Sequence, residues 1–373
     1  MDSVTSDGCL VVDGYAPWSN PDDIISQEVE YWVSMVTSAG LIPLLCLIGV
    51  PGNALSAAVF YRQGLRKRIN LCLFSLALAD VMVAVFYGYI YAEGAYREVT
   101  GSAAYFVPVF IGFTGFAWVS QFLSAVIASE RCFCVVSPFR AQKVLKTSSM
   151  AVIIVVVSAI LLGGMLAIIG PKHSAVCIYH PATNTTRDVI YVTDYYLAHK
   201  EIFDVIDVFI YSAAFPIVIL TTVVITTVVT ATKLQAASRW RQQSATAGMA
   251  IEQPNYNIPA ISTKELALTK MLIATSLLLI VCMTPTLLVQ LATFMVPDLN
   301  KLGRYHNLMI ILWAGVTFFR VLNSSLNFFV YYYMGSKFRE TLKQVVTCRG
   351  RDANTSKEGQ NSDHRFSNIS SSL

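Results

Sequence analysis

Residues 150–169 read MAVIIVVVSAILLGGMLAII, twenty residues in a row without one charged side chain. At a rise of about 1.5 Å per residue, a helix of this length crosses the roughly 30 Å hydrocarbon core of a bilayer. Because lipid offers the backbone no hydrogen-bond partner, such a stretch must be helical. Six further apolar stretches run approximately over residues 34–60, 71–91, 103–129, 205–231, 266–296 and 308–333. The sequence therefore predicts an all-α bundle of seven transmembrane helices.

The composition excludes a soluble globular domain. Of the 373 residues, 55% are hydrophobic and 13% are charged, against about 25% charged in ordinary soluble domains. No Lys or Arg precedes Arg62, whereas the first, third and fifth gaps between the apolar stretches are basic. By the positive-inside rule these gaps are cytoplasmic. We therefore expect a multi-pass protein of the plasma membrane, with an extracellular N-terminus, a cytoplasmic C-terminus and no cleaved signal peptide.

Polar side chains inside the apolar stretches are functional hypotheses, because each costs free energy in lipid unless it finds a partner. Asp80 is the one carboxylate near mid-depth, in the second stretch. The other such residues are Asn53, Ser120, Gln121, Asn323, Ser324, Ser325 and Asn327. Together they predict one inward-facing polar site. The alternative is that each side chain bonds separately to a neighbouring helix.

A second set of charges lies at the predicted inner ends of two helices. Glu130 and Arg131 end the third stretch, and Glu265 precedes Pro285 of the sixth by 20 positions, about 30 Å along a helix. Glu265 is thus expected at the depth of Arg131. An Arg held by both carboxylates would resist separation of the two inner ends; the alternative is independent charges that reach the interface.

Only two of the eight cysteines, Cys9 and Cys177, are extracellular by this topology. We expect them to form a disulfide that ties the N-terminal segment to the second outer loop. Two free thiols or an intermolecular bridge are the alternatives. In the same outer loop, Asn184-Thr185-Thr186 is a glycosylation sequon, and Asn184 is the predicted acceptor.

Short motifs occur in a fixed order along the seven stretches. They are Gly52-Asn53, the run ending in Asp80, Glu130-Arg131-Cys132 with Pro138 beyond it, Pro216, Cys282-Met283-Thr284-Pro285, and Asn323-Ser324-Ser325-Leu326-Asn327-Phe328-Phe329-Val330-Tyr331. In this order they resemble the motifs of rhodopsin-like (class A) G-protein-coupled receptors, and the match covers all seven stretches. The seventh-helix form, which has Phe328 in place of proline, is similar to that of invertebrate neuropeptide receptors of the FMRFamide and myosuppressin type.

The resemblance assigns roles to residues of this chain. An activation switch would comprise Glu130, Arg131, Glu265, Met283, Pro285 and Tyr331. A sodium pocket, holding Na⁺ as an allosteric ion and no other cofactor, would comprise Asp80, Ser120, Asn323, Ser324 and Asn327. The resemblance also implies an extracellular segment over residues 1–33, a receptor domain over 34–335, an amphipathic helix over 336–347 and a cytoplasmic tail over 348–373, with Cys348 as a palmitoylation site.

Three departures from the family pattern indicate a relay that differs in detail. The usual Cys at the outer start of the third helix is missing, so Cys177 lacks its customary partner. The sixth-helix toggle Trp is replaced by Met283. Phe328 removes the kink that a seventh-helix proline would give.

The ligand is expected to be a peptide rather than an amine. No Asp or Glu occurs between Gly101 and Ser129, where amine receptors place a carboxylate, and Phe113 stands at that position. Aromatic residues and outer carboxylates favour a cationic, amidated peptide. The predicted ligand-binding residues are Glu93, Phe110, Phe113, Asp204, Asp207 and Gln290. An invertebrate chemosensory or lipid-type class A receptor is the alternative.

The expected partners are an extracellular peptide or small molecule, a heterotrimeric G protein, an arrestin at the Ser-rich tail and membrane lipids, with no nucleic acid. A transporter or channel would need an inverted repeat and a charged midplane path, which the sequence lacks. An intramembrane enzyme would need Ser/His or paired Asp residues at one depth. Neither arrangement occurs, so we expect no enzymatic activity.

Overall fold

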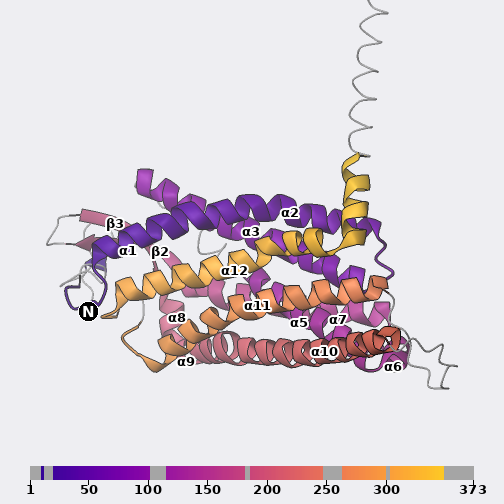
Figure 1. The fold of residues 1–373 in the computed structure, drawn as a ribbon. Helices are drawn as coiled ribbons and strands as arrows, with labels where there is room; N and C mark the ends of the chain where they lie inside the picture. Colours follow the sequence, from indigo (N-terminus) through magenta and orange to yellow (C-terminus); the bar gives the residue numbers. More distant parts are fainter. Residues whose placement is uncertain are drawn as a thin grey trace, which may run out of the picture.

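The computed structural model describes residues 10–11, 20–100, 115–180, 185–246, 263–299 and 303–347. Seven of its helices are long and apolar enough to cross a membrane, and they lie side by side in one bundle (Figure 1). The spans are Gln27–Arg62, Arg68–Glu93, Gly115–Val136, Thr147–Ile168, Lys200–Arg239, Leu266–Met295 and His306–Met334. The predicted all-α, seven-helix fold is confirmed.

The spans and the short connections between them contain the following helices. They are α1 (Gln27–Ser34), η2 (Met35–Leu41), α2 (Ile42–Arg62), α3 (Arg68–Thr100), α5 (Gly115–Val136), α6 (Pro138–Val144), α7 (Thr147–Lys172), α8 (Asp194–Ala198), α9 (Lys200–Asp204), η4 (Val205–Ala214), α10 (Phe215–Thr246), α11 (Thr263–Met295) and α12 (His306–Met334). The two π-helical segments, η2 and η4, each precede a proline in the first turn of the next α-helix, Pro43 and Pro216. Proline cannot donate the usual helical hydrogen bond, so the hydrogen-bond pattern changes at these points.

The first helix begins at Gln27, seven residues before the predicted start at residue 34. The side chain of Ser26 caps it by accepting a hydrogen bond from the Val29 amide at 3.4 Å. Glu28 and Glu30 in its first turn complement the helix dipole. The prediction rested on apolar content and therefore missed these polar first turns.

A three-stranded sheet lies at one end of the bundle, and the sequence analysis did not predict it. Strand β1 (Leu10–Val11) pairs in parallel with β2 (His173–His180), which pairs antiparallel with β3 (Thr185–Val192). Leu10 lies opposite Ile178; these residues follow Cys9 and Cys177 directly in the sequence. Cys9 lies outside the described residues, as does Asn184, so the disulfide and the glycosylation site stay predictions.

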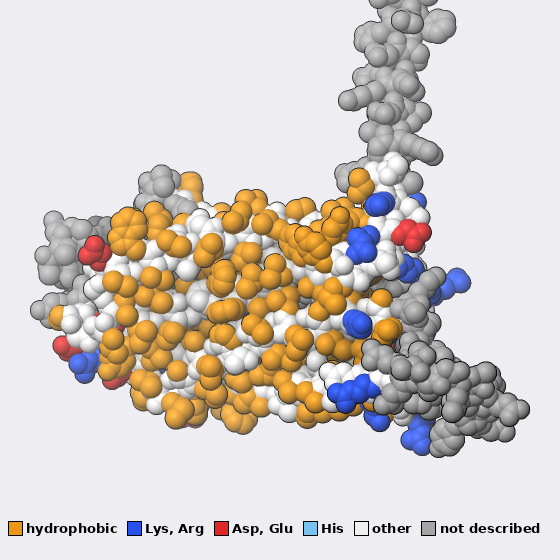
Figure 2. Space-filling view, in the orientation of Figure 1, with side chains coloured by type: hydrophobic (Ala, Val, Ile, Leu, Met, Phe, Trp, Pro, Cys, Tyr) orange, Lys and Arg blue, Asp and Glu red, His pale blue; other side chains and the backbone are white. Residues whose placement is uncertain are grey.

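The sides of the bundle are apolar, and its interior holds the polar residues. Figure 2 shows hydrophobic side chains covering the length of the bundle, with Lys and Arg gathered at the end where α12 finishes. On α7, Val155 and Ile160 are 65% and 64% exposed, and the one charged residue of this helix is Lys172, in its last turn. Such a helix is hydrophobic all round, as lipid contact requires.

A separate helix over residues 336–347 follows α12 after Gly335. It turns sharply away from the bundle axis (Figure 1). Phe338 and Leu342 on one face are buried, whereas Glu340 and Lys343 are exposed. This is the amphipathic helix after the seventh span that the sequence predicts. It is called the eighth helix below and is distinct from α8. Cys348 and the tail lie outside the described residues.

Helices α2 and α12 approach closely because two glycines face α12. A Cβ added at Gly49 would lie 2.5 Å from Ser325 Oγ, and one at Gly52 would lie 3.1 Å from Phe328 Cβ. Ser325 Oγ also donates to the Leu45 carbonyl at 2.9 Å. Small residues of this kind allow helix backbones to pack tightly in a membrane.

Replacing Gly49 with Ala is expected to lower the midpoint of thermal unfolding of the purified protein. Overpacking costs about 1–3 kcal/mol, which exceeds the roughly 1 kcal/mol that Ala gains over Gly in a helix. Gly163→Ala is the matched control, because nothing lies within 4 Å of a Cβ there, and we expect it to be neutral or stabilising. Equal shifts for the two variants would contradict the close-packing argument.

Candidate functional site

A buried carboxylate joins three helices at the centre of the bundle. Asp80 on α3 has no exposed surface. Its Oδ1 accepts a hydrogen bond from Ser120 Oγ of α5 at 2.6 Å, and its Oδ2 accepts one from Asn327 Nδ2 of α12 at 2.8 Å. The predicted inward-facing site therefore contains these three residues in direct contact. Asp80 forms no ion pair in the described part of the chain.

Other polar residues of the set instead connect neighbouring helices. Asn53 on α2 donates to the carbonyls of Gly49 and Ser324, at 3.0 and 2.8 Å. Its contact with Ser324 ties α2 to α12, as the Ser325–Leu45 bond does. For Asn53 and Ser325 the simpler interpretation, a bond to an adjacent helix, is the one that the structure supports.

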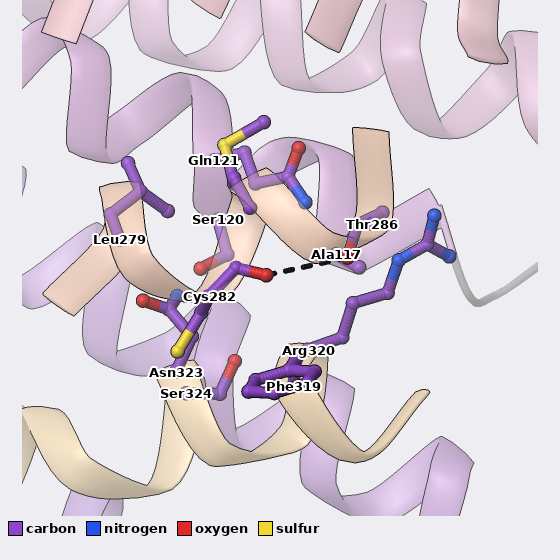
Figure 3. A pocket seen from close by; sticks show the side chains of 11 residues that line it. Ala117, Ser120, Gln121, Leu279, Cys282, Thr286, Phe319, Arg320, Asn323 and Ser324 are labelled. Carbon is purple, nitrogen blue, oxygen red and sulfur yellow. Dashed lines mark hydrogen bonds between the residues drawn. The ribbon is translucent and has the colours of Figure 1, made fainter. Parts of the chain in front are cut away.

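A small cavity of about 10 Å³ adjoins the buried carboxylate (Figure 3). Its lining comes from α5, α11 and α12 and comprises Ala117, Ser120, Gln121, Leu279, Cys282, Met283, Thr286, Phe319, Arg320, Asn323 and Ser324. Ser120 belongs both to the pocket and to the contacts of Asp80. Asn323 and Ser324, assigned to the sodium pocket, line this space, and the Ser324 side chain also forms a hydrogen bond with Asp80.

Near the C-terminal end of α5, Glu130 forms ion pairs with two arginines. Its Oε2 lies 2.7 Å from Arg131 Nε, and its Oε1 lies 3.5 Å from Arg68 Nε. The Glu130 side chain is 1% exposed. Arg68 also donates to the Leu145 carbonyl at 2.6 Å, so it fastens the start of α3 to α5 and to the loop after α6. Arg68 was not predicted as a partner of Glu130, because nothing in the spacing of the two residues along the sequence indicates this contact.

Arg131 also faces a second small cavity, of about 10 Å³, between α5, α10 and α11. Its lining is largely small and polar: Ala128, Thr226, Thr227, Thr230, Thr269, Leu272, Ile273 and Ser276 accompany Arg131. Glu265 lies in the first turn of α11, but its side chain is outside what the structure describes. The Arg131–Glu265 contact stays a prediction.

Aromatic packing occupies the place of the missing seventh-helix proline. The Tyr331 ring lies 5.3 Å from Phe60 and 5.7 Å from Phe338, and Phe328 lies 6.1 Å from Phe338, centroid to centroid. The cluster links α2, α12 and the helix over residues 336–347. Pro285 lies within α11, and Met283, two residues before it, is 3% exposed.

The comparison with known families decides the identity of the chain. The model of the 7 transmembrane receptor (rhodopsin family) matches residues 52–331, three quarters of the sequence. The chain belongs to this receptor family. No curated protein matches it in a sequence search.

Membership of this receptor family implies the following general properties for the chain. It is a signalling receptor of the membrane, with an extracellular ligand and a G protein as partners. The family is generally not enzymatic. Among the described residues no cluster of three or more His, Cys, Asp or Glu side chains could hold a metal ion.

The structure places some of the predicted ligand-binding residues of the receptor. Lys172 Nζ lies 2.5 Å from Asp207 Oδ2, so this carboxylate is already ion-paired. Glu93 and Gln290 are buried at the outer ends of α3 and α11. Phe110, Phe113 and the side chain of Asp204 lie outside what the structure describes.

Replacing Arg68 with Gln is expected to lower the stability of the receptor by about 1 kcal/mol, because Glu130 loses a partner and the Leu145 carbonyl loses a donor. The measurement is the thermal unfolding midpoint in detergent. Arg66→Gln is the matched control, since Arg66 is exposed and contributes only its backbone carbonyl, to Thr147. A shift of the same size in the control would show that the contact adds nothing.

Proposed function

We propose that this receptor transmits the binding of an extracellular neuropeptide to a heterotrimeric G protein, and that its inner ends separate when it does so. The observation that carries the proposal is the arrangement around Arg131. This residue is paired with a buried carboxylate and faces a space bounded by three helices. Movement of α11 away from α5 would open that space to the interior of the cell.

The charge distribution supports an extracellular N-terminus and a cytoplasmic C-terminus. Lys and Arg side chains gather at the end of the bundle where α12 finishes (Figure 2), as the positive-inside rule requires of a cytoplasmic surface. Arg62 and Arg339 lie at this end and donate to backbone carbonyls of the eighth helix and of α12. The basic charge gathered at this end suits anionic headgroups, so we include membrane lipids among the partners.

A peptide ligand is supported by the outer face and by the seventh-helix motif. The sheet of β1, β2 and β3 and the Asp23 carboxylate, which accepts from the Asn307 amide at 2.6 Å, bring the N-terminal segment to the outer end of α12. Extended backbone at this position offers strand pairing to a peptide. A chemosensory ligand is the second candidate. Screening amidated neuropeptides and odorants on expressing cells decides between them, and arrestin recruitment by the Ser-rich tail is measured in the same assay.

Neutralising Glu265 is expected to raise ligand-free signalling. If this carboxylate pairs with Arg131 in the resting state, losing an ion pair worth about 1 kcal/mol shifts the resting–active equilibrium by about fivefold. Basal G-protein activation by Glu265→Gln in cells measures this. Glu340→Gln, a loss of an exposed acid on the eighth helix, is the matched control. Unchanged basal activity in Glu265→Gln would contradict an Arg131–Glu265 ion pair that stabilises the resting state.

We also propose that the buried carboxylate binds Na⁺. Asp80 is a buried acid without a cationic partner among the described residues, and the surrounding Ser120, Asn323, Ser324 and Asn327 provide hard oxygen donors. A bound cation would supply the missing counter-charge and hold α3, α5 and α12 together.

Sodium is therefore expected to stabilise the purified receptor against heat, by about 1.4 kcal/mol at ten times its dissociation constant. Asp80→Asn, which keeps the shape of the side chain and loses its charge, should abolish the response. Choline chloride at equal ionic strength is the control. A sodium response that persists in Asp80→Asn would place the ion elsewhere.

A further inference from the structure

An arginine lies halfway along a membrane-spanning helix of this receptor. Arg320 is fourteen residues after His306 and fourteen before Met334, the two ends of α12, about 21 Å from each at the usual helical rise. A cationic side chain at the centre of a bilayer costs several kcal/mol unless it faces the bundle interior and has a role there. Arg320 lines the pocket beside the buried carboxylate, so it faces the interior.

Four helices contribute neighbours to the guanidinium. Its Nη1 lies 3.5 Å from Tyr87 Oη of α3, and its carbon lies 5.1 Å from the Trp118 ring of α5 and 5.9 Å from the Trp313 ring of α12. With the Gln290 amide of α11 oriented to satisfy both of its neighbours, the amide oxygen accepts from Arg320 Nη2 at 3.2 Å and the nitrogen donates to the Ser212 carbonyl at 2.8 Å. These contacts fix the guanidinium in position without neutralising it.

The charge of Arg320 is uncompensated in the described part of the chain. The three ion pairs there are Arg68–Glu130, Arg131–Glu130 and Lys172–Asp207. Two described acids were predicted to bind the ligand: Asp207 is already neutralised by Lys172, and Glu93 is buried at the outer end of α3. At the middle of α12, Arg320 therefore presents a positive charge to a ligand that enters between the helices.

Two hydrogen-bond donors at this point also lack acceptors. Arg320 Nε and Trp313 Nε1 are both buried, and neither has a hydrogen-bond partner among the described residues. Figure 3 shows the guanidinium extending from α12 toward the side of the pocket that Thr286 and Ala117 form. Unsatisfied buried donors are costly. A group that brings both negative charge and acceptor oxygens would satisfy them.

We propose that Arg320 is the anchor for a carboxylate of the receptor's ligand. A guanidinium binds a carboxylate with paired N–H···O bonds, and the low dielectric of the bundle strengthens that attraction. The proposal rests on the proposed receptor function and refines the ligand class: the peptide carries a free C-terminal or side-chain carboxylate, or the ligand is a fatty acid. A C-terminal amide or a cationic group on the ligand, which the sequence favours, cannot form an ion pair with Arg320.

The test uses the purified full-length receptor in lipid nanodiscs and pairs of probes that differ only in the carboxylate. One arm compares a panel of short peptides, each as the free acid and as the C-terminal amide. The other compares C14–C22 fatty acids with their methyl esters. The thermal unfolding midpoint is measured against probe concentration, which gives an apparent dissociation constant without any G protein.

At least one acid probe is expected to stabilise the wild type about tenfold to a hundredfold more potently than its neutral twin, as the loss of a charged hydrogen bond predicts. Arg320→Gln should abolish the preference, and Arg320→Lys should retain part of it. Arg304→Gln, which removes an exposed arginine at the outer end, is the matched control and should keep it in full. The arm that responds identifies the source of the carboxylate.

Three outcomes would overturn the proposal: no acid-selective probe in either arm, equal potency of acid and neutral twins, or a preference that survives in Arg320→Gln. If Arg320→Gln does not fold, by its unliganded midpoint, the comparison of Arg320→Lys with the wild type decides. Because binding is read without signalling, loss of this contact is distinguishable from failure of the proposed G-protein coupling, which the Glu265→Gln measurement tests.

Discussion

The constraint on which the rest of the bundle depends is the burial of the Asp80 carboxylate. A carboxyl group in a membrane interior must find its partners inside the protein. Its two oxygens accept from Ser120 and Asn327, so α3, α5 and α12 must converge at one depth. The close approach of α2 to α12 at Gly49 and Gly52 follows, because Asn53 and Ser325 complete the polar contacts around the same level.

The same requirement operates at the inner end, with a different result. Glu130 is as buried as Asp80, but two arginines, Arg68 and Arg131, accompany it. Removing one member of such a buried group leaves the others uncompensated. The inner end is therefore stabilised by ion pairs, with which a partner protein can compete. The centre is stabilised by hydrogen bonds from neutral side chains to one carboxylate. Arg320 is the reverse case: its neighbours orient it without supplying an opposite charge.

The departures from the family pattern have local structural counterparts. Phe328 replaces a proline, and its ring packs against Phe338 of the eighth helix, while Gly52 of α2 gives its Cβ room. Met283 replaces an aromatic residue and is buried with Leu279, Val223 and Ala125 in one apolar cluster. A flexible, unbranched side chain fills such a space without a fixed ring orientation. A conformational change that passes from the pocket to the inner end therefore moves the flexible Met283 side chain, where other members of the family have an aromatic ring.

The sequence by itself determined the seven helices, because twenty apolar residues without charge have one stable form in lipid. It also identified Asp80, Ser120, Asn327, Glu130 and Arg131, since each is a polar residue where hydrocarbon penalises polarity. It did not show that Arg68 reaches Glu130 or that Lys172 neutralises Asp207, because those contacts join residues 62 and 35 positions apart. Nor did it show the outer sheet or the uncompensated charge of Arg320. Only the packing of helices against one another decides which charges meet, and that packing depends on side-chain shape across the whole bundle rather than on spacing along one helix.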